Sequence, residues 1–148
     1  MTHMNLRISF LGIGLMGTPM TRNLLDAGFS MTLWNRTTSK CEPFASEATI
    51  AGTPAEAVAE ADIVITMLEN GQVVDDVLVN QGALAAVKVG ALVIDMSSVQ
   101  PSLARQHAEL AAEQGVGYVD APVSGGTVGA AEARLSIMAG GSEADIER

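Results

Sequence analysis

The sequence predicts an α/β fold, in which a doubly wound, mostly parallel β-sheet carries helices on both faces. Apolar segments of strand length alternate with helix-length segments along the chain, a pattern typical of βαβ units. The strongest strand candidates are almost continuously apolar, as expected when helices cover both faces of a sheet. A glycine-rich turn at residues 12–17 joins the first apolar segment to the first helical one. The 148 residues suit a single domain.

The strands are predicted from the apolar segments in order. The strong candidates are residues 6–11, 30–35, 62–68 and 91–96, and the weaker ones are residues 48–51, 117–120 and 135–139.

The first helices are predicted from the signals at their ends. Residues 16–27 form a helix that Gly28 ends with a left-handed cap. Thr37 or Thr38 is expected to cap the next helix. Thr53 precedes a proline that suits the first helical position, so a short helix is expected from there to about residue 61.

The last helix is predicted over residues 101–114. Leu103, Leu110 and Ala111 are expected to form the apolar stripe that faces the core. His107 stands in a polar turn of this helix, and we expect it on the surface.

Composition excludes several classes of function. Apolar residues make up 48% of the chain and charged residues 17%, so much of the sequence is expected to be buried. The formal net charge is −9, from 8 basic and 17 acidic residues, and only 3% of residues are aromatic. An acidic chain without aromatic side chains on which bases could stack is a poor match for nucleic acid. We therefore expect no nucleic-acid partner.

Cysteine content and hydropathy bear on metals and localisation. The single cysteine, Cys41, cannot form an intramolecular disulfide, and no cysteine and histidine spacing resembles a zinc site. We expect a cytoplasmic protein without a metal site. Residues 8–21 are uncharged and superficially resemble a signal peptide, but their glycines and proline would weaken a helical apolar core. No other segment approaches the length of a membrane span, so no membrane partner is expected.

The glycine-rich turn is the sharpest functional signal. Gly12, Gly14 and Gly17 form a GxGxxG motif that directly follows the first strand and opens the first helix. In this position Gly12 permits a tight turn, Gly14 lets the backbone approach a pyrophosphate, and Gly17 allows close packing of helix on strand. The helix N-terminus offers free N–H groups to the phosphates. The motif predicts a Rossmann-type dinucleotide-binding fold. The other residues of this predicted cofactor loop are Ile13, Leu15 and Met16.

The end of the second strand indicates which dinucleotide binds. An NAD-binding domain usually has an acid about twenty residues after the loop, where it accepts from the ribose 2′-hydroxyl. This chain has Asn35, Arg36 and Thr37 there. Arg36 can form charge-assisted bonds to a 2′-phosphate, with Asn35 and Thr37 as additional donors, whereas an acid would repel that phosphate. We therefore predict NADP(H) in preference to NAD(H). The alternative is that Arg36 is a solvated surface charge.

Two further clusters, residues 95–101 and 120–126, follow predicted strands. They lie at the edge where open α/β sheets bind ligands. The hydroxyl of Ser124 and the backbone N–H groups of Gly125 and Gly126 could hold a carboxylate. Taken alone, this Ser-Gly-Gly sequence also fits a flexible turn.

Together these motifs make the sequence similar to the beta-hydroxyacid dehydrogenase family. That family includes 3-hydroxyisobutyrate dehydrogenases, tartronate semialdehyde reductases and glyoxylate/succinic semialdehyde reductases. The similarity covers essentially the whole chain in the family's order, and residues 120–126 are its most specific part. The matching segments are residues 12–17, 19–20, 23–24, 35–37, 66–68, 95–98, 120–126 and 138–141.

The resemblance implies roles for individual residues. Besides the glycine loop, the cofactor site would be lined by Met67, Leu68 and Ser98. The residues that would hold the substrate's carboxylate are Ser124, Gly125 and Gly126. The sequence departs from the family at Glu69, where the family often has proline, and at residues 133–134, where it often has Gly-Thr. These departures put the fine placement of substrate in doubt.

The resemblance also implies an activity. Family members transfer hydride between a nicotinamide and a small 3-hydroxy acid, or a glycolate-type hydroxy acid, and its aldehyde. The implied partner is therefore a small carboxylate-bearing aldehyde or hydroxy acid. With NADPH as donor, the activity is best described as that of a semialdehyde or glyoxylate reductase.

The family's catalytic group is expected outside this chain. It is a lysine of a second, all-helical domain, and the resemblance places it beyond Arg148. The chain's own lysines, Lys40 and Lys88, lie outside the family's lysine motif. We therefore expect residues 1–148 to form a dinucleotide-binding domain that binds cofactor but is catalytically incomplete. A full-length protein is expected to be a homo-oligomer, because family dimers are built largely through the helical domain.

Two other interpretations stay open. One is a free-standing dinucleotide-sensing or interaction module without catalysis. The other is an imine-reductase-like member of the same superfamily, against which the pattern at residues 120–126 argues.

Overall fold

The computed structural model describes residues 6–14, 17–97 and 99–121, together with the backbone of residues 123–124, 136–137 and 140–141. Its strands are β1 (Arg7–Leu11), β2 (Ser30–Trp34), β3 (Thr49–Ile50), β4 (Ile63–Thr66), β5 (Leu92–Asp95), β6 (Gly117–Asp120), β7 (Val123–Ser124), β8 (Ser136–Ile137) and β9 (Gly140–Gly141).

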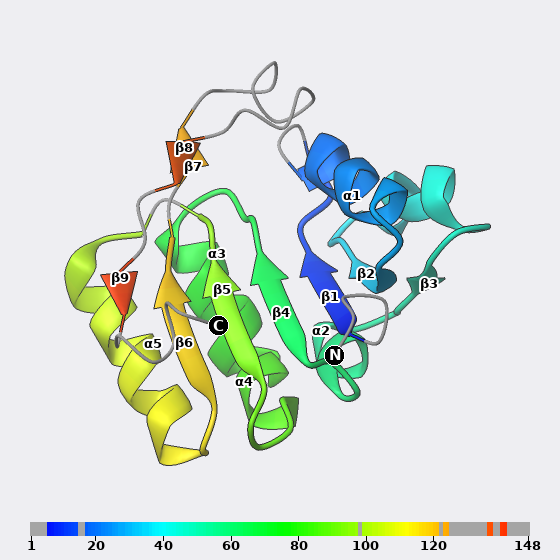
Figure 1. Cartoon of the computed structure of the whole chain (residues 1–148). Coiled ribbons are helices and arrows are strands. Elements are labelled where there is room, and N and C mark those ends of the chain that lie inside the picture. Colours follow the sequence, from blue (N-terminus) through cyan, green and yellow to red (C-terminus); the bar gives the residue numbers. More distant parts are fainter. Residues whose placement is uncertain are drawn as a thin grey trace.

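One sheet runs through the molecule in the order β3-β2-β1-β4-β5-β6-β9 (Figure 1). Its first six strands are parallel, and β9 pairs antiparallel with β6. Strands β7 and β8 form a separate antiparallel pair. The strand order reverses between β1 and β4, as it does in doubly wound sheets. The predicted fold class is confirmed.

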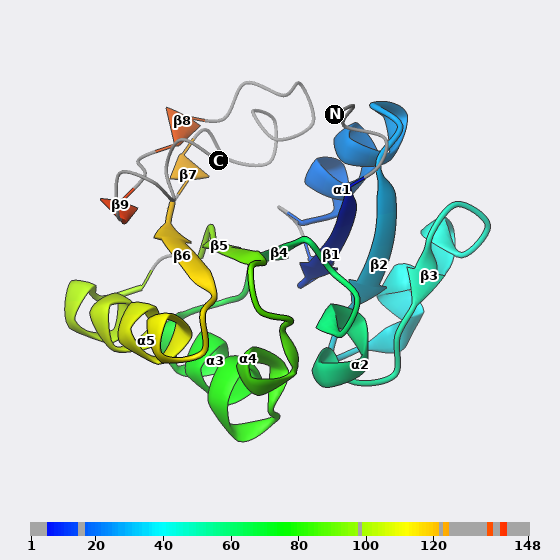
Figure 2. The same ribbon diagram turned by 60° about the horizontal axis from the view of Figure 1, so that its bottom comes forward.

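The helices cover both faces of this sheet. They are α1 (Gly17–Asp26), the 3₁₀ helix η2 (Thr38–Phe44), α2 (Pro54–Val58), α3 (Gly71–Asp75), the π-helix η3 (Asp76–Asn80), α4 (Ala83–Ala86) and α5 (Pro101–Glu113). Figure 2 shows α2, α3, α4 and α5 along one face and α1 on the other. Within the described residues, no helix is long and apolar enough to span a membrane.

Alternation along the strands builds a core on each face. Phe10 and Leu33 pack with Phe44 of η2 on the face that α1 covers. The neighbouring residues Leu11 and Trp34 point the other way and join the core beneath α2 to α5. Because successive strand side chains alternate between faces and helices cover both, six of the ten residues of β1 and β2 are apolar and buried.

The predicted elements agree with the structure in kind and differ in extent. Every predicted strand contains an observed one, but the segment at 135–139 holds only β8, which lies outside the main sheet. The predicted cap at Thr53 is confirmed, because its hydroxyl accepts from the N–H of Glu56. Thr37 occupies the predicted N-cap position, but the helix that follows is a 3₁₀ helix and the Thr37 side chain makes no cap hydrogen bond.

The helical segment from 71 to 86 was not predicted. Asn70 caps it by accepting from the N–H of Val73 at 3.0 Å. Val74, Val77 and Leu78 are fully buried and follow a helical spacing, which is the signal that could have revealed this segment.

The buried face of α5 differs from the predicted one. Leu110 is 37% exposed, whereas His107 is fully buried, along with Ala104 and Ala111. The Nε2 atom of His107 lies 2.9 Å from a carboxylate oxygen of Asp75, so the histidine joins α5 to α3. His107 comes three residues after Ala104, so the helical period places both on the buried face of α5. The carboxylate of Asp75 in α3 pairs with the imidazole and makes the burial of His107 possible.

Candidate functional site

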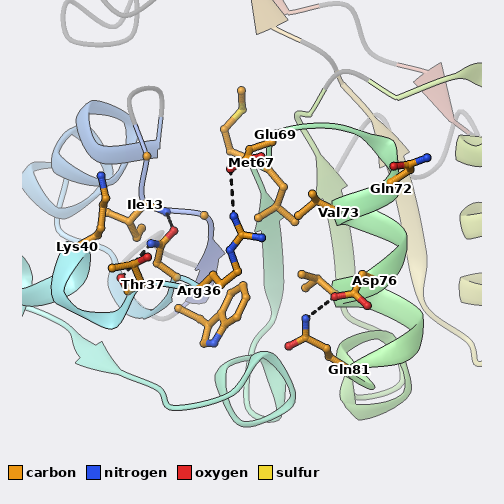
Figure 3. A pocket seen from close by; sticks show the side chains of 16 residues that line it. Ile13, Arg36, Thr37, Lys40, Met67, Glu69, Gln72, Val73, Asp76 and Gln81 are labelled. Atoms are coloured by element: carbon orange, nitrogen blue, oxygen red, sulfur yellow. Dashed lines mark hydrogen bonds and ion pairs between the residues drawn. The ribbon is translucent and has the colours of Figure 1, made fainter.

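A pocket of about 410 Å³ lies at the carboxyl ends of β1, β2 and β4. This is where the strand order reverses, the position at which open α/β sheets bind ligands. Figure 3 shows one wall formed by Ile13, Thr37 and Lys40 and the opposite wall formed by Gln72, Val73, Asp76 and Gln81.

The glycine turn forms the base of the pocket, and its glycines differ in their surroundings. Gly12 has φ +108°, and a Cβ there would collide with the carbonyl oxygen of Met67. A Cβ on Gly17 would collide with the carbonyl oxygen of Gly12, so the first turn of α1 packs directly on the loop. Gly14 is exposed and would meet nothing within 4 Å. Gly12 and Gly17 are therefore required by the fold, whereas Gly14 leaves backbone open toward the pocket.

Asn35 ties the end of β2 to the glycine turn. Its Oδ1 atom accepts from the N–H of Ile13 at 2.9 Å, and its Nδ2 atom donates to the carbonyl of Thr37 at 3.0 Å. The amide was predicted to be an additional donor to a phosphate, and in the structure its two hydrogen bonds position the loop. It holds the loop that carries Arg36 in register with residues 12–14.

Arg36 crosses the pocket from the β2 side toward the loop after β4. Its Nη2 atom lies 3.4 Å from Oε1 of Glu69, and both side chains are mostly exposed, at 73% and 71% (Figure 3). Lys40 of η2 also lines the pocket and has no ion-pair partner among the described residues. Two cations, Arg36 and Lys40, therefore line the pocket beyond the end of β2.

A buried carboxylate organises the neighbouring strand ends. Asp95 is fully buried; its Oδ1 atom accepts from the hydroxyl of Thr66 at 2.8 Å and from the N–H of Ser97 at 3.0 Å. The hydroxyl of Tyr118 donates to its Oδ2 atom at 3.3 Å. The Ser97 hydroxyl in turn accepts from the N–H of Leu68 at 2.8 Å. This network connects β5 and β6 to the loop after β4 that lines the pocket.

Burial shifts the pKa values in this network. Burial raises the pKa of Asp95 above its ordinary value, and the three donors oppose that rise. The pKa of Asp120, its register partner on β6, is raised by burial and by the charge of Asp95. Burial and Asp95 also raise the pKa of Tyr118, which therefore stays a hydrogen-bond donor.

The structure brings most of the predicted cofactor residues together. The predicted residues that line the pocket are Gly12, Ile13, Gly14, Asn35, Arg36, Thr37, Met67 and Leu68. Gly17 packs beneath the turn. The predicted residues outside the described part of the chain are Leu15, Met16, Ser98, Gly125 and Gly126, and only the backbone of Ser124 is described, in β7.

Sequence reasoning missed eight residues that line the pocket, including the whole wall opposite Ile13 (Figure 3). The lining residues that it did not predict are Trp34, Lys40, Glu69, Gln72, Val73, Asp76, Val77 and Gln81. The helical spacing of the valines could have found part of this wall. The sequence marks Glu69 only as a departure from the family, and its relation to Arg36 becomes visible only in the structure, where the two residues meet across the pocket. Within the described ranges, no group of histidine, cysteine and acidic residues could hold a metal ion.

The parallel sheet, the glycine turn at its switch point and the pocket above it define a dinucleotide-binding domain of the Rossmann type. The sequence profile for the NAD binding domain of 6-phosphogluconate dehydrogenase matches residues 7–148. The chain belongs to the beta-hydroxyacid dehydrogenase family, as an N-terminal NAD(P)-binding domain.

Individual relatives agree with this assignment. The chain is 40% identical to the NAD-dependent L-serine dehydrogenase of Pseudomonas aeruginosa over 96% of its own length and 48% of the relative's. The structure of Mycobacterium tuberculosis 3-hydroxyisobutyrate dehydrogenase with L-serine matches at a TM-score of 0.90 and 40% identity, covering 97% of this chain and 49% of that one. The structure of a reductive aminase from Aspergillus terreus, in complex with NADPH and ethyl levulinate, matches at a TM-score of 0.81 and 28% identity. The match covers 96% of this chain and 50% of the aminase. The chain spans about half the length of the curated relatives it matches.

Proposed function

We propose that this chain binds NADP(H), in preference to NAD(H), in the pocket at the β1–β4 switch point. The single observation that supports this preference is Arg36, which stands with its guanidinium in the pocket where an NAD-binding domain would have an acid. The residues also suit a dinucleotide. Gly14 leaves room for a pyrophosphate, and Met67 and Leu68 supply an apolar surface beside it. NAD-dependent and NADPH-bound relatives both occur, so a direct test of this chain is needed.

Arg36→Ala is expected to weaken NADPH binding by about tenfold or more, because a charge-assisted bond to the 2′-phosphate is lost. NADH has no such phosphate, so its dissociation constant should stay within about twofold. Calorimetric titration of both cofactors measures this difference. The matched control is Arg105→Ala, which removes an exposed arginine from α5 outside the pocket. Equal weakening of both cofactors, or tighter wild-type binding of NADH than of NADPH, would refute the preference.

We propose further that the cofactor serves an oxidoreductase that interconverts a small carboxylate-bearing hydroxy acid and its aldehyde. The bound nicotinamide supplies the hydride. This chain's part is to position that group: residues 12–14 form the base beneath the phosphates, and the Asp95 network holds the loop at residues 67–68. Ser124, Gly125 and Gly126 would hold the substrate's carboxylate. The family resemblance implies that the proton donor would be a lysine of a second, helical domain.

A screen of NADPH oxidation tests the activity. Glyoxylate and succinic, methylmalonic and tartronic semialdehydes are offered to the 148-residue chain and to a longer protein in which a helical domain with the family's lysine follows it. We expect the longer protein to reduce at least one of the four. The 148-residue chain should bind NADPH yet react about 10²- to 10⁴-fold more slowly, because it lacks a placed proton donor. A cyclic imine is offered as a fifth substrate, and its reduction alone would favour the imine-reductase interpretation. No reaction in either protein would favour a non-catalytic module.

A further inference from the structure

Arg36 has a counterion within the cofactor pocket. The ion pair of 3.4 Å joins its guanidinium to the carboxylate of Glu69, and within the described residues Arg36 has no other ion-pair partner. The two residues are 33 positions apart and come from the loops after β2 and after β4, so their contact spans the pocket (Figure 3).

The position of Glu69 follows from its neighbours, which are both anchored. The N–H of Leu68 donates to the hydroxyl of Ser97 at 2.8 Å, and the side chain of Asn70 caps α3. The loop is anchored on both sides of Glu69, so the backbone of Glu69 is held where its side chain lines the pocket.

The acids cancel the cationic character that Arg36 confers on the site. The charged lining residues are the cations Arg36 and Lys40 and the acids Glu69 and Asp76, so their formal charges sum to zero. Asp76 is held by the side-chain amides of Gln81 at 2.7 Å and Asn80 at 3.1 Å, which lower its pKa, and the charge of Arg36 lowers that pKa further without a direct ion pair. Glu69 has only Arg36. A bound phosphate that pairs with Arg36 would therefore deprive Glu69 of its partner.

We propose that Glu69 determines how strongly the site prefers the 2′-phosphorylated cofactor. A 2′-phosphate needs the guanidinium that Glu69 occupies, and it must also approach the carboxylate, which repels it. NAD(H) brings a 2′-hydroxyl instead, which can donate to an acid. Glu69 therefore weakens the binding of NADP(H) and leaves the binding of NAD(H) unaffected. The preference for NADP(H) over NAD(H) is smaller than it would be if Arg36 had no acidic partner. This inference rests on the proposed binding of NADP(H) in this pocket.

Glu69→Gln tests the inference, because it keeps the size of the side chain and removes its charge. Calorimetric titration of the 148-residue chain with NADPH and NADH is repeated with adenosine 2′,5′-bisphosphate and AMP, which report on the adenosine end alone. We expect Glu69→Gln to bind NADPH and the bisphosphate about threefold to tenfold more tightly, with NADH and AMP changed by less than about twofold. The gain should shrink at high salt, because both side chains are exposed.

A matched control uses the same geometry elsewhere. Arg7 and Glu60 also form an exposed ion pair of 3.4 Å, and neither residue lines this pocket. Glu60→Gln should leave all four affinities unchanged. An equal gain from Glu60→Gln would mean that only the net charge of the chain matters, and it would overturn the inference.

The Arg36→Ala background separates competition for Arg36 from other effects. In the Arg36→Ala protein, Glu69→Gln should increase NADPH affinity by less, because the only effect left to remove is the direct repulsion between Glu69 and the phosphate. An undiminished gain in that background, or an unchanged NADPH to NADH affinity ratio in Glu69→Gln itself, would overturn the inference alone. If the wild-type chain bound neither cofactor, the proposed function and this inference would both fail.

Discussion

Gly12→Ala is expected to destabilise the chain by about 3 kcal/mol and to abolish cofactor binding. Gly12 has φ +108°, which alanine adopts only with strain, and the added methyl would collide with the carbonyl oxygen of Met67. That carbonyl belongs to the backbone that follows β4, so neither the strand nor the turn can move without disturbing the sheet. Urea denaturation measures the loss of stability, and calorimetric titration measures the loss of NADPH binding.

The matched variant is Gly14→Ala. A methyl group there meets nothing within 4 Å, and Gly14 is not among the described glycines with positive φ. Its free energy of unfolding should therefore stay within about 0.5 kcal/mol of wild type. NADPH binding should still weaken, because the backbone can no longer approach the pyrophosphate. A Gly12→Ala protein as stable as Gly14→Ala would contradict the packing described here.

The second large effect is expected at the buried carboxylate. Asp95→Ala should lower the free energy of unfolding by about 3 kcal/mol, because it leaves the buried hydroxyl of Thr66 and the buried N–H of Ser97 without their acceptor. Cofactor affinity should fall as well, since Ser97 holds the N–H of Leu68 at the pocket. Urea denaturation and NADPH titration measure the two effects.

Asp26→Ala is the control for this substitution. Asp26 is exposed and forms only a surface ion pair with Arg22 at 3.6 Å, so its loss should change stability by less than about 0.5 kcal/mol. Equal stability of Asp95→Ala and Asp26→Ala would show that the network does not stabilise the fold.

The raised pKa of Asp95 also has a consequence for pH dependence. Between the ordinary carboxyl pKa and the raised one, the folded chain holds a proton that the unfolded chain has released. The contribution of Asp95 to stability therefore decreases as pH rises through this window and is constant above it. Asp95→Asn removes this component, so its stability relative to wild type should increase with pH across the window. Asp62, whose pKa is lowered by Lys88, contributes with the opposite sign in both proteins and cancels in the comparison.

Much of the fold could be predicted because its signals are local. Near-continuous apolar segments indicated the parallel strands, and Thr53 and Gly28 marked helix ends through backbone geometry that neighbouring residues decide. The region between β4 and β5 was missed, although its buried valines follow a helical spacing. His107 was misplaced for a different reason. Its burial depends on Asp75, which comes from another helix 32 residues away in the sequence.

By itself, the sequence determined the class of fold, the glycine turn and the basic residue at the end of β2. These features depend on residue type and on spacings within a single βα unit, where neighbouring residues determine the backbone conformation. Only the tertiary structure decided which carboxylates face that basic residue and hold the strand ends. Glu69 reaches Arg36, and Asp95 reaches Tyr118, because parallel pairing aligns the carboxyl ends of separate strands at one edge. The sequence therefore identifies Arg36 as the cation of this site, and only the fold shows that Glu69 is its counterion.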